Sequence, residues 1–373
     1  MKTHREPTFR ISKRGVSLPR WKNWGIRGIA LIASLILCAI IIFAIVKLNP
    51  LKVYGTMFEG AFGTSKRSWV TIRDAMMLLC IAIGLAPAFK MRFWNIGAEG
   101  QVLVGGIVSA ACMIYLGGKL PNGVLIPLMF LCSIVAGAIW GIIPGIFKAK
   151  WNTNETLFTL MMNYIAIQLT SFFVSKWEYP FGSNTVGIIP RDSSKAGWLP
   201  NMFSSGFNSD FGWNVLIVLV LTVAMFIYLK YTKQGYEIAV VGESENTARY
   251  AGIKVSKVYI RTMLLSGAIC GLAGFVAVSG AAHSISTSTA GGRGFTAIVV
   301  AWLGKLNPFS MMLVAFGLVF MQKGSLEIAS QFNLNENASE IITGIILFFI
   351  LGCEFFINYR LEFRKHEKEA AKA

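Results

Sequence analysis

Long apolar windows, bounded by charged residues, proline or glycine, recur along the whole 373-residue chain. A helix needs about 20 such residues to cross the roughly 30 Å hydrocarbon core of a bilayer, because it rises about 1.5 Å per residue. The windows predict about ten spans, at residues 28–46, 70–89, 97–117, 124–147, 156–175, 213–231, 261–281, 288–305, 308–323 and 341–358. The pattern therefore predicts an all-α polytopic membrane protein.

The eighth window is the shortest of the ten. Its apolar core, GFTAIVVAWLG from Gly294 to Gly304, would make only about 16 Å of helix. A re-entrant half-helix is the alternative, since interrupted helices inside a membrane are tolerated where protein or a water-filled cavity surrounds them. The basic C-terminal tail favours ten crossings over nine.

Lysine and arginine placement predicts the orientation. An even number of crossings puts both termini on one side, and the segments of that side carry most of the lysines and arginines. We therefore expect cytoplasmic basic tails at 1–27 and 359–373 around a transmembrane domain at 28–358. Within that domain, 232–260 is expected to be a cytoplasmic loop, and 177–211, rich in Pro, Gly and Ser, an external one.

Composition supports this assignment. The chain is 54% hydrophobic and 14% charged, whereas soluble domains have about a quarter charged residues. A net charge of +17 would suit a nucleic-acid binder, but the basic residues lie mainly in the tails and between the apolar windows, so we expect no nucleic-acid partner. The six cysteines all lie in apolar windows without CxxC spacing and are expected to be buried thiols.

Motifs for catalysis, ATP binding and metal binding are missing from the sequence. It contains no P-loop, no H-E-x-x-H, no G-x-S-x-G and no Cys/His cluster with metal spacing. We therefore expect no catalytic residues, no metal and no cofactor in this chain. A transporter or channel component fits the composition better than a membrane enzyme.

Glycine patterns predict packing and an internal duplication. Small residues four apart in GAIWGIIPG and GAICGLAG predict close helix contacts. GAEG at Gly97–Gly100 and GGRG at Gly291–Gly294 each open the third span of one half of the chain. Two such halves would form an inverted five-plus-five repeat, a transporter arrangement in which glycine-interrupted segments mark the solute pathway.

The loop at 232–260 predicts one short helix. Ser244 can accept hydrogen bonds from free backbone N–H groups, Glu245 suits the positive end of the helix, and Gly252 permits a left-handed stop. A two-turn helix is unstable alone, so it should pack on the protein or dock to a partner.

Four segments, in order, carry a family resemblance: RFWNIGAEGQ, NETLFTLMMNYIA, the loop motif G-x(6)-GE-x(4)-ARYAGI, and GRGFTAIVVAWLGKLNP. Together they resemble the permease subunit of bacterial ABC importers of the simple-sugar and branched-chain amino acid class, and within it the nucleoside-importing branch. The resemblance implies a non-enzymatic subunit in the cytoplasmic membrane. Its implied partners are the lipid bilayer, cytoplasmic ATPase subunits, a second homologous permease and an external substrate-binding lipoprotein.

The resemblance also implies that the short helix in 232–260 is a coupling helix that docks in a cleft of the ATPase. The residues that inherit this role are Glu243, Ser244, Glu245, Asn246, Ala248, Arg249, Tyr250 and Gly252. One departure is Ala239, where relatives often have arginine, and it puts a salt bridge to the ATPase in doubt.

Glu99 is a carboxylate at the start of an apolar window, where an ionisable group needs a partner or an aqueous path. In one interpretation, Glu99 and Gln101 satisfy backbone donors or pair with a neighbouring basic residue. In the other, a polar set lines the translocation path, comprising Asn95, Glu99, Gln101, Asn163 and Arg293.

Two alternatives to nucleoside import stay open. A sugar or riboflavin-type ABC permease would have the same fold. An ion-coupled secondary transporter would need a carboxylate relay, and the candidates Asp74, Glu99 and Glu354 are expected in different spans near opposite faces of the membrane.

Overall fold

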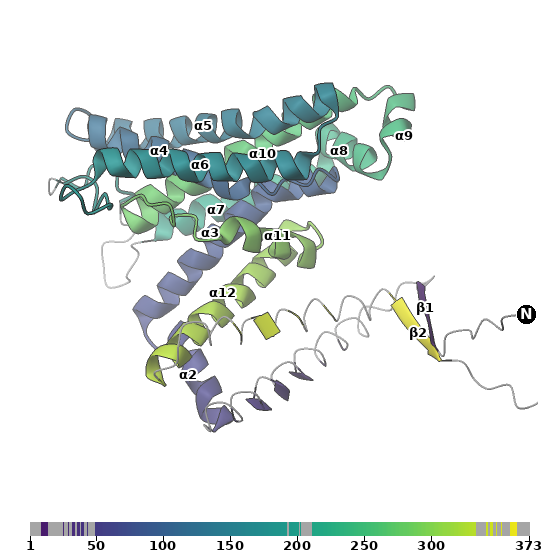
Figure 1. Cartoon of the computed structure of the whole chain (residues 1–373), viewed down its shortest axis with the longest axis horizontal. Helices are drawn as coiled ribbons and strands as arrows, with labels where there is room; N and C mark the ends of the chain where they lie inside the picture. Colours follow the sequence, from purple (N-terminus) through teal and green to yellow (C-terminus); the bar gives the residue numbers. More distant parts are fainter. Residues whose placement is uncertain are drawn as a thin grey trace, which may run out of the picture. The chain divides into compact units, whose positions relative to one another are not determined.

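Figure 1 shows the computed structural model of the chain. The structure describes residues 9–13, 49–191, 194–200, 202, 211–332 and 359–363, with isolated positions at 25–43 and 341–352. The predicted first and last spans, 28–46 and 341–358, and most of both tails therefore lie outside the described residues. The chain divides into two compact units, Phe62–Phe320 and a smaller unit of Met1–Ala61 with Met321–Ala373.

In its described residues, the larger unit is built of helices and their connections. They are α3 (Ser65–Lys90), α4 (Ala98–Leu116), α5 (Asn122–Trp151), α6 (Glu155–Trp177), α7 (Gly212–Tyr231), α8 (Lys233–Glu243), α9 (Glu245–Tyr250), α10 (Val255–Ala277), its π-helical continuation η1 (Val278–Ala282), α11 (Arg293–Leu303) and the start of α12 (Pro308–Gln331). Within the described residues, seven helices are long and apolar enough to cross a membrane: α3, α4, α5, α6, α7, α10 with η1, and α12. They confirm the predicted second to seventh and ninth spans.

α11 has 11 residues, or about 16 Å of helix, which is too short to cross a bilayer. Of the two interpretations of the eighth window, the half-helix is the one that fits. The rest of the expected span, from 288 to 292, is turns and bends rather than helix.

The smaller unit contains elements that the sequence pattern did not predict. α2 (Pro50–Phe62) packs against α12, where Gly60 and Gly324 leave room for the close approach of Glu327 and Met57 respectively. Strand β1 (Phe9–Lys13) pairs antiparallel with β2 (Tyr359–Phe363), so that Phe9 lies opposite Phe363. This ribbon joins segments from the two ends of the chain.

α10 packs against α5 along a seam of glycines. A Cβ atom added at Gly137 would overlap the carbonyl of Gly267, and one added at Gly141 would lie 2.8 Å from the Gly267 Cα. A Cβ at Gly271 would overlap the Ser133 carbonyl in the same way. The backbones therefore touch directly, as the glycine spacing predicted.

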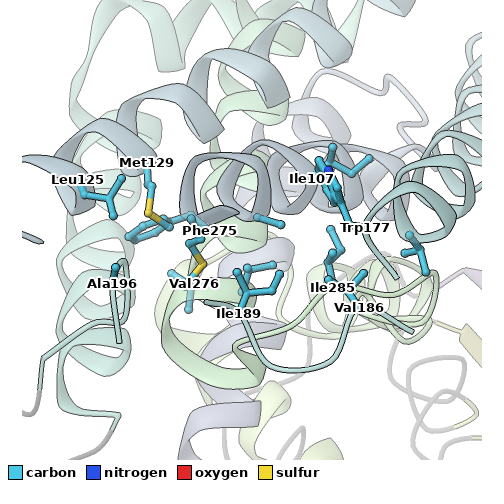
Figure 2. Packing of buried hydrophobic residues seen from close by; sticks show 14 of the residues in the cluster. Ile107, Leu125, Met129, Trp177, Val186, Ile189, Ala196, Phe275, Val276 and Ile285 are labelled. Carbon is cyan, nitrogen blue, oxygen red and sulfur yellow. The ribbon is translucent and has the colours of Figure 1, made fainter. Parts of the chain in front are cut away.

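The loop after α6 packs onto one end of α10 and η1. Figure 2 shows Ile189, Val186 and Trp177 gathered with Ile107 of α4 and Phe275 of α10 in one buried cluster. The Ile189 N–H donates to the His283 carbonyl at 2.8 Å, and the Leu199 N–H donates to the Ser279 carbonyl at 3.1 Å. The His283 and Trp198 rings stack with centroids 3.7 Å apart. This loop is therefore a fixed cover on the bundle end.

Candidate functional site

A polar turn at residues 91–97 connects α3 to α4, and buried side chains hold it in place. Asn95, which is fully buried, accepts a hydrogen bond from the Gly97 N–H at 3.0 Å through Oδ1. Its Nδ2 donates to the Ser266 hydroxyl of α10 at 3.0 Å and to Gln101 Oε1 at 3.4 Å. Asn95 and Gln101 therefore bond to each other and tie the start of α4 to the middle of α10.

α6 supplies the cap that α4 lacks. The N-cap residue of α4 is Gly97, which has no side chain, so its helix-start N–H groups need other acceptors. Asn163 Oδ1 accepts from the Gly100 N–H at 2.8 Å, and Asn163 Nδ2 donates to the Ile96 carbonyl at 2.8 Å. The Thr159 hydroxyl accepts from the Ile96 N–H at 3.2 Å. Asn163 is therefore a buried bridge between α6 and the turn.

Glu99 caps the half-helix α11. Its Oε1 accepts from the Gly292 N–H at 2.8 Å and its Oε2 accepts from the Gly294 N–H at 2.7 Å. A Cβ at Gly294 would lie 2.6 Å from the Glu99 backbone nitrogen, so only glycine permits this approach. The carboxylate also lies at the positive end of α11, where negative charge is favoured. Glu99 thus satisfies backbone donors, and the GAEG and GGRG motifs lie directly against each other.

Asp74 holds the same segment from the other side. Arg293, between the two glycines that Glu99 binds, has its Nη2 3.6 Å from Asp74 Oδ1. Arg73 also binds this oxygen, through Nε at 3.0 Å and Nη2 at 2.9 Å. Asp74 and Glu99, which were expected near opposite faces of the membrane, both contact residues 292–294. Glu354 lies outside the described residues.

All five residues of the proposed path set belong to one polar cluster. Asn95, Glu99, Gln101 and Asn163 are each no more than 6% exposed and bond within the protein. Arg293 differs, since about a third of its side chain, 31%, is exposed. Four members therefore fix the starts of α4 and α11, and Arg293 alone presents part of its surface to the outside of the unit.

The second candidate region is α9, which forms as predicted. The Ser244 hydroxyl accepts from the Thr247 N–H at 3.3 Å, and Gly252 has φ +76° at the stop. Ala248 is buried, whereas Tyr250 is 94% exposed. Glu243, Asn246 and Arg249 are also exposed. The helix therefore has one face packed on the protein and one face free to contact a partner.

Contacts to α10 anchor the helices of this region. Glu245 Oε1 accepts from the Tyr259 hydroxyl at 2.5 Å, and Glu237 of α8 pairs with Arg261 at 3.1 Å. Glu245 also contacts Arg249 one turn later at 3.3 Å. Sequence reasoning missed Tyr259, Arg261 and α8, because an isolated tyrosine or arginine at a span boundary carries no signal of its partner. Of the predicted coupling residues, Glu245 therefore hydrogen-bonds to α10, and the buried Ala248 packs in the same hydrophobic cluster as Tyr259.

Comparison with known proteins gives a family match over most of the chain. Residues 70–351 match the family described as branched-chain amino acid transport system / permease component. The glucose ABC transporter permease protein TsgB13 of Haloferax volcanii is 30% identical, over 92% of this chain and 91% of that protein. The guanosine ABC transporter permease protein NupP of Bacillus subtilis is 30% identical over 80% and 84%. The nucleoside ABC transporter permease protein NupB of Lactococcus lactis is 30% identical over 89% and 92%. No solved structure matches the chain.

Proposed function

The chain belongs to the branched-chain amino acid transport system / permease component family and is a multi-pass permease subunit of an ABC importer, and we propose that its solute is a nucleoside. Permeases of this family are transport components, so ATP is hydrolysed on a separate subunit. Two relatives that share 30% identity with this chain are named for guanosine and for nucleosides. A sugar is the second candidate, because the relative named for glucose has the same identity over 92% of this chain.

The charge balance around the polar cluster supports an uncharged solute. Two arginines, Arg73 and Arg293, are balanced there by two carboxylates, Asp74 and Glu99. Each carboxylate already has donors: Asp74 has the arginines and Glu99 has two backbone N–H groups. A charged solute would lose its hydration without gaining a free counter-charge in this cluster, and that loss costs several kcal/mol. A neutral polar solute such as a nucleoside avoids this cost.

The proposed assembly contains two permeases, two cytoplasmic ATPases and an external substrate-binding lipoprotein in the bacterial cytoplasmic membrane. Both termini of this chain, at 1–27 and 359–373, would be cytoplasmic, with ten crossings in two inverted halves of five. The eighth crossing would consist of the irregular stretch at 283–292 together with the half-helix α11. The 177–211 loop would then face outward and 232–260 inward. The lysine and arginine distribution supports this orientation.

We propose that α9 is the coupling helix. The exposed Tyr250, Asn246 and Arg249 would enter the ATPase cleft, and the buried Ala248 holds the opposite face on the bundle. When the two ATPase subunits bind ATP and close, they would move α9 and α8 together. Glu245–Tyr259 and Glu237–Arg261 would pass that movement to α10.

α10 is suited to carry the movement because close contacts bind it on two sides. The glycine seam joins it to α5, and Gly274 approaches the Val102 carbonyl of α4. Ser266 joins it to Asn95 in the polar cluster. A shift of α10 would therefore displace the starts of α4 and α11 and rock the bundle between inward-open and outward-open states. In this mechanism Arg293 borders the solute path, while Asn95, Glu99, Gln101 and Asn163 shape it.

Uptake by cells that express the complete transporter tests the proposal. Labelled guanosine should enter, unlabelled uridine should compete with it, and glucose should not. Tyr250→Ala should abolish uptake without lowering the amount of permease in the membrane. Tyr236→Ala is the matched control, since Tyr236 is an exposed tyrosine of α8, at 66%. Full uptake by the Tyr250 variant would refute coupling through α9, and competition by glucose alone would transfer the assignment to sugars.

A further inference from the structure

The chain between η1 and the end of α11 follows α4 toward its N-terminus and then runs beside α3. At its start, Ile285 packs over Gly106, where an added Cβ would lie 3.4 Å from the Ile285 side chain. Gly292 then reaches Glu99, about 10 Å farther along α4. At the other end, the Trp302 ring of α11 stacks on Trp94 at 5.5 Å. The segment 283–303 therefore runs from the loop-covered end of the bundle to the polar turn that follows α3.

Part of this segment is both irregular and exposed. Thr287, Ser288, Gly291 and Gly292 are exposed and lie in turns or bends before α11. Inside a bilayer, irregular backbone does not face lipid, because its N–H and C=O groups would lack partners. This stretch descends along α4, which is long and apolar enough to span. Its exposed side must therefore face water or another protein.

The exposed side combines hydroxyl groups with aromatic rings. Between 284 and 289 every residue except Ile285 carries a hydroxyl, and the Ser286 and Ser288 hydroxyls are 3.0 Å apart. Phe295 and Trp302 of α11 are 46% and 48% exposed. They are two helical turns apart and so lie on one face of α11.

We propose that this exposed side is the wall of the translocation path that the nucleoside contacts. The half-helix face, as we call it, consists of Thr287, Ser288, Gly291, Gly292, Phe295 and Trp302. Aromatic rings stack with any nucleobase, because every base has a π-face. The Thr287 and Ser288 hydroxyl groups can exchange hydrogen bonds with ribose hydroxyls. The inference rests on the proposed nucleoside transport and assigns the solute contact to residues outside the polar cluster.

Cysteine labelling tests whether the face is in water. Ser288→Cys is introduced into the complete transporter in proteoliposomes and treated with a charged, membrane-impermeant methanethiosulfonate. The unmodified chain gives the background, which is needed because Cys112 and Cys132 are half-buried rather than fully buried as expected, whereas Cys80 and Cys270 are buried. Phe181→Cys, on the loop after α6 where Phe181 is 95% exposed, is the positive control. Val220→Cys, 63% exposed on the apolar α7, is the negative one.

The path assignment predicts that Ser288→Cys reacts at least tenfold faster than Val220→Cys and that guanosine slows its reaction. No reaction above the Val220 level would overturn it. Fast disulfide crosslinking of Ser288→Cys between two permease subunits, with no effect of guanosine, would also overturn it by placing the face in a subunit interface.

Uptake assays test the class of solute independently of the position of the translocation path. Phe295→Leu and Trp302→Leu should each lower guanosine uptake about tenfold at subsaturating concentration, with normal abundance in the membrane. Phe309→Leu is the control, since Phe309 of α12 is 44% exposed and outside the half-helix face. Unchanged uptake by both variants would overturn stacking on these rings. If the unmodified transporter takes up glucose but not guanosine, the proposed function fails, and slowing of Ser288→Cys labelling by glucose would still identify the path.

Discussion

Replacing Glu99 with alanine should destabilise the permease strongly. The substitution removes two charge-assisted hydrogen bonds, to the Gly292 and Gly294 N–H groups at 2.8 and 2.7 Å. Each such bond contributes about 1.5–3 kcal/mol, so the loss is about 3–6 kcal/mol. This is a large share of a typical stability of about 5–15 kcal/mol. Glu99→Gln keeps one acceptor oxygen and should lose about half as much.

The matched control is Glu178, which makes the same pair of bonds at the surface. Its two carboxylate oxygens accept from the Gly182 and Asn184 N–H groups at 2.9 and 3.0 Å. Water can replace the lost acceptor there, so Glu178→Ala should cost no more than about 1 kcal/mol. The comparison isolates the effect of burial on the same chemistry.

The effect is measured by heating the detergent-purified protein and monitoring unfolding as the loss of monodispersity. At roughly 2–4 °C per kcal/mol for a unit of this size, Glu99→Ala should lower Tm by at least about 6 °C and Glu178→Ala by no more than about 4 °C. Equal shifts for the two alanine variants would refute the reasoning, because they would mean that the half-helix does not depend on a buried cap.

Three further variants test other parts of the structure. Tyr259→Phe removes the hydrogen bond to Glu245. It should leave ATP hydrolysis intact and lower coupled uptake about tenfold, which corresponds to about 1.4 kcal/mol. A proportional loss of both activities would contradict a coupling role. Gly271→Ala would push a Cβ atom into an α5 carbonyl and should prevent the folded protein from accumulating. Gly123→Ala, which has open space around it, should accumulate normally. Western blots of membranes compare the amounts of the two variants. Burial and two neighbouring cations, Arg73 and Lys195, lower the pKa of His283 in the folded protein. As the pH drops below about 6.5, the unfolded chain therefore takes up a proton at this histidine before the folded protein does, and stability falls. Tm should therefore decrease more in the unmodified protein than in His283→Asn between pH 7.5 and 5.5, and parallel decreases would contradict this.

Local sequence signals predicted the elements whose causes are local. Apolar length was enough to place the seven spans in the described residues. The side chain of Ser244 and the left-handed Gly252 were enough to predict α9, since capping acts within one turn. Glycines spaced by four predicted the α5–α10 seam because small residues on one face permit close approach.

The site could be predicted only in part, because its contacts join distant residues. Glu99 binds an N–H group 195 positions away, and no periodicity reports which segment a carboxylate will meet. The half-helix hypothesis predicted the short length of α11 but not that Glu99 caps its N-terminus. The pairing of Asp74 with Arg293 was missed for the same reason, since the two residues lie in different helices more than 200 positions apart. α8 was missed because its 11 residues mix charged and apolar positions between two strong spans.

ATP-driven uptake by reconstituted proteoliposomes tests the central claim most directly. The vesicles would contain this permease with its partner permease and ATPases, and substrate-binding protein would be supplied with labelled guanosine. The account predicts accumulation that requires ATP, is lost with Tyr250→Ala and is retained with Tyr236→Ala. Guanosine entry that continues without ATP, or ATP-driven entry of glucose but not guanosine, would contradict it.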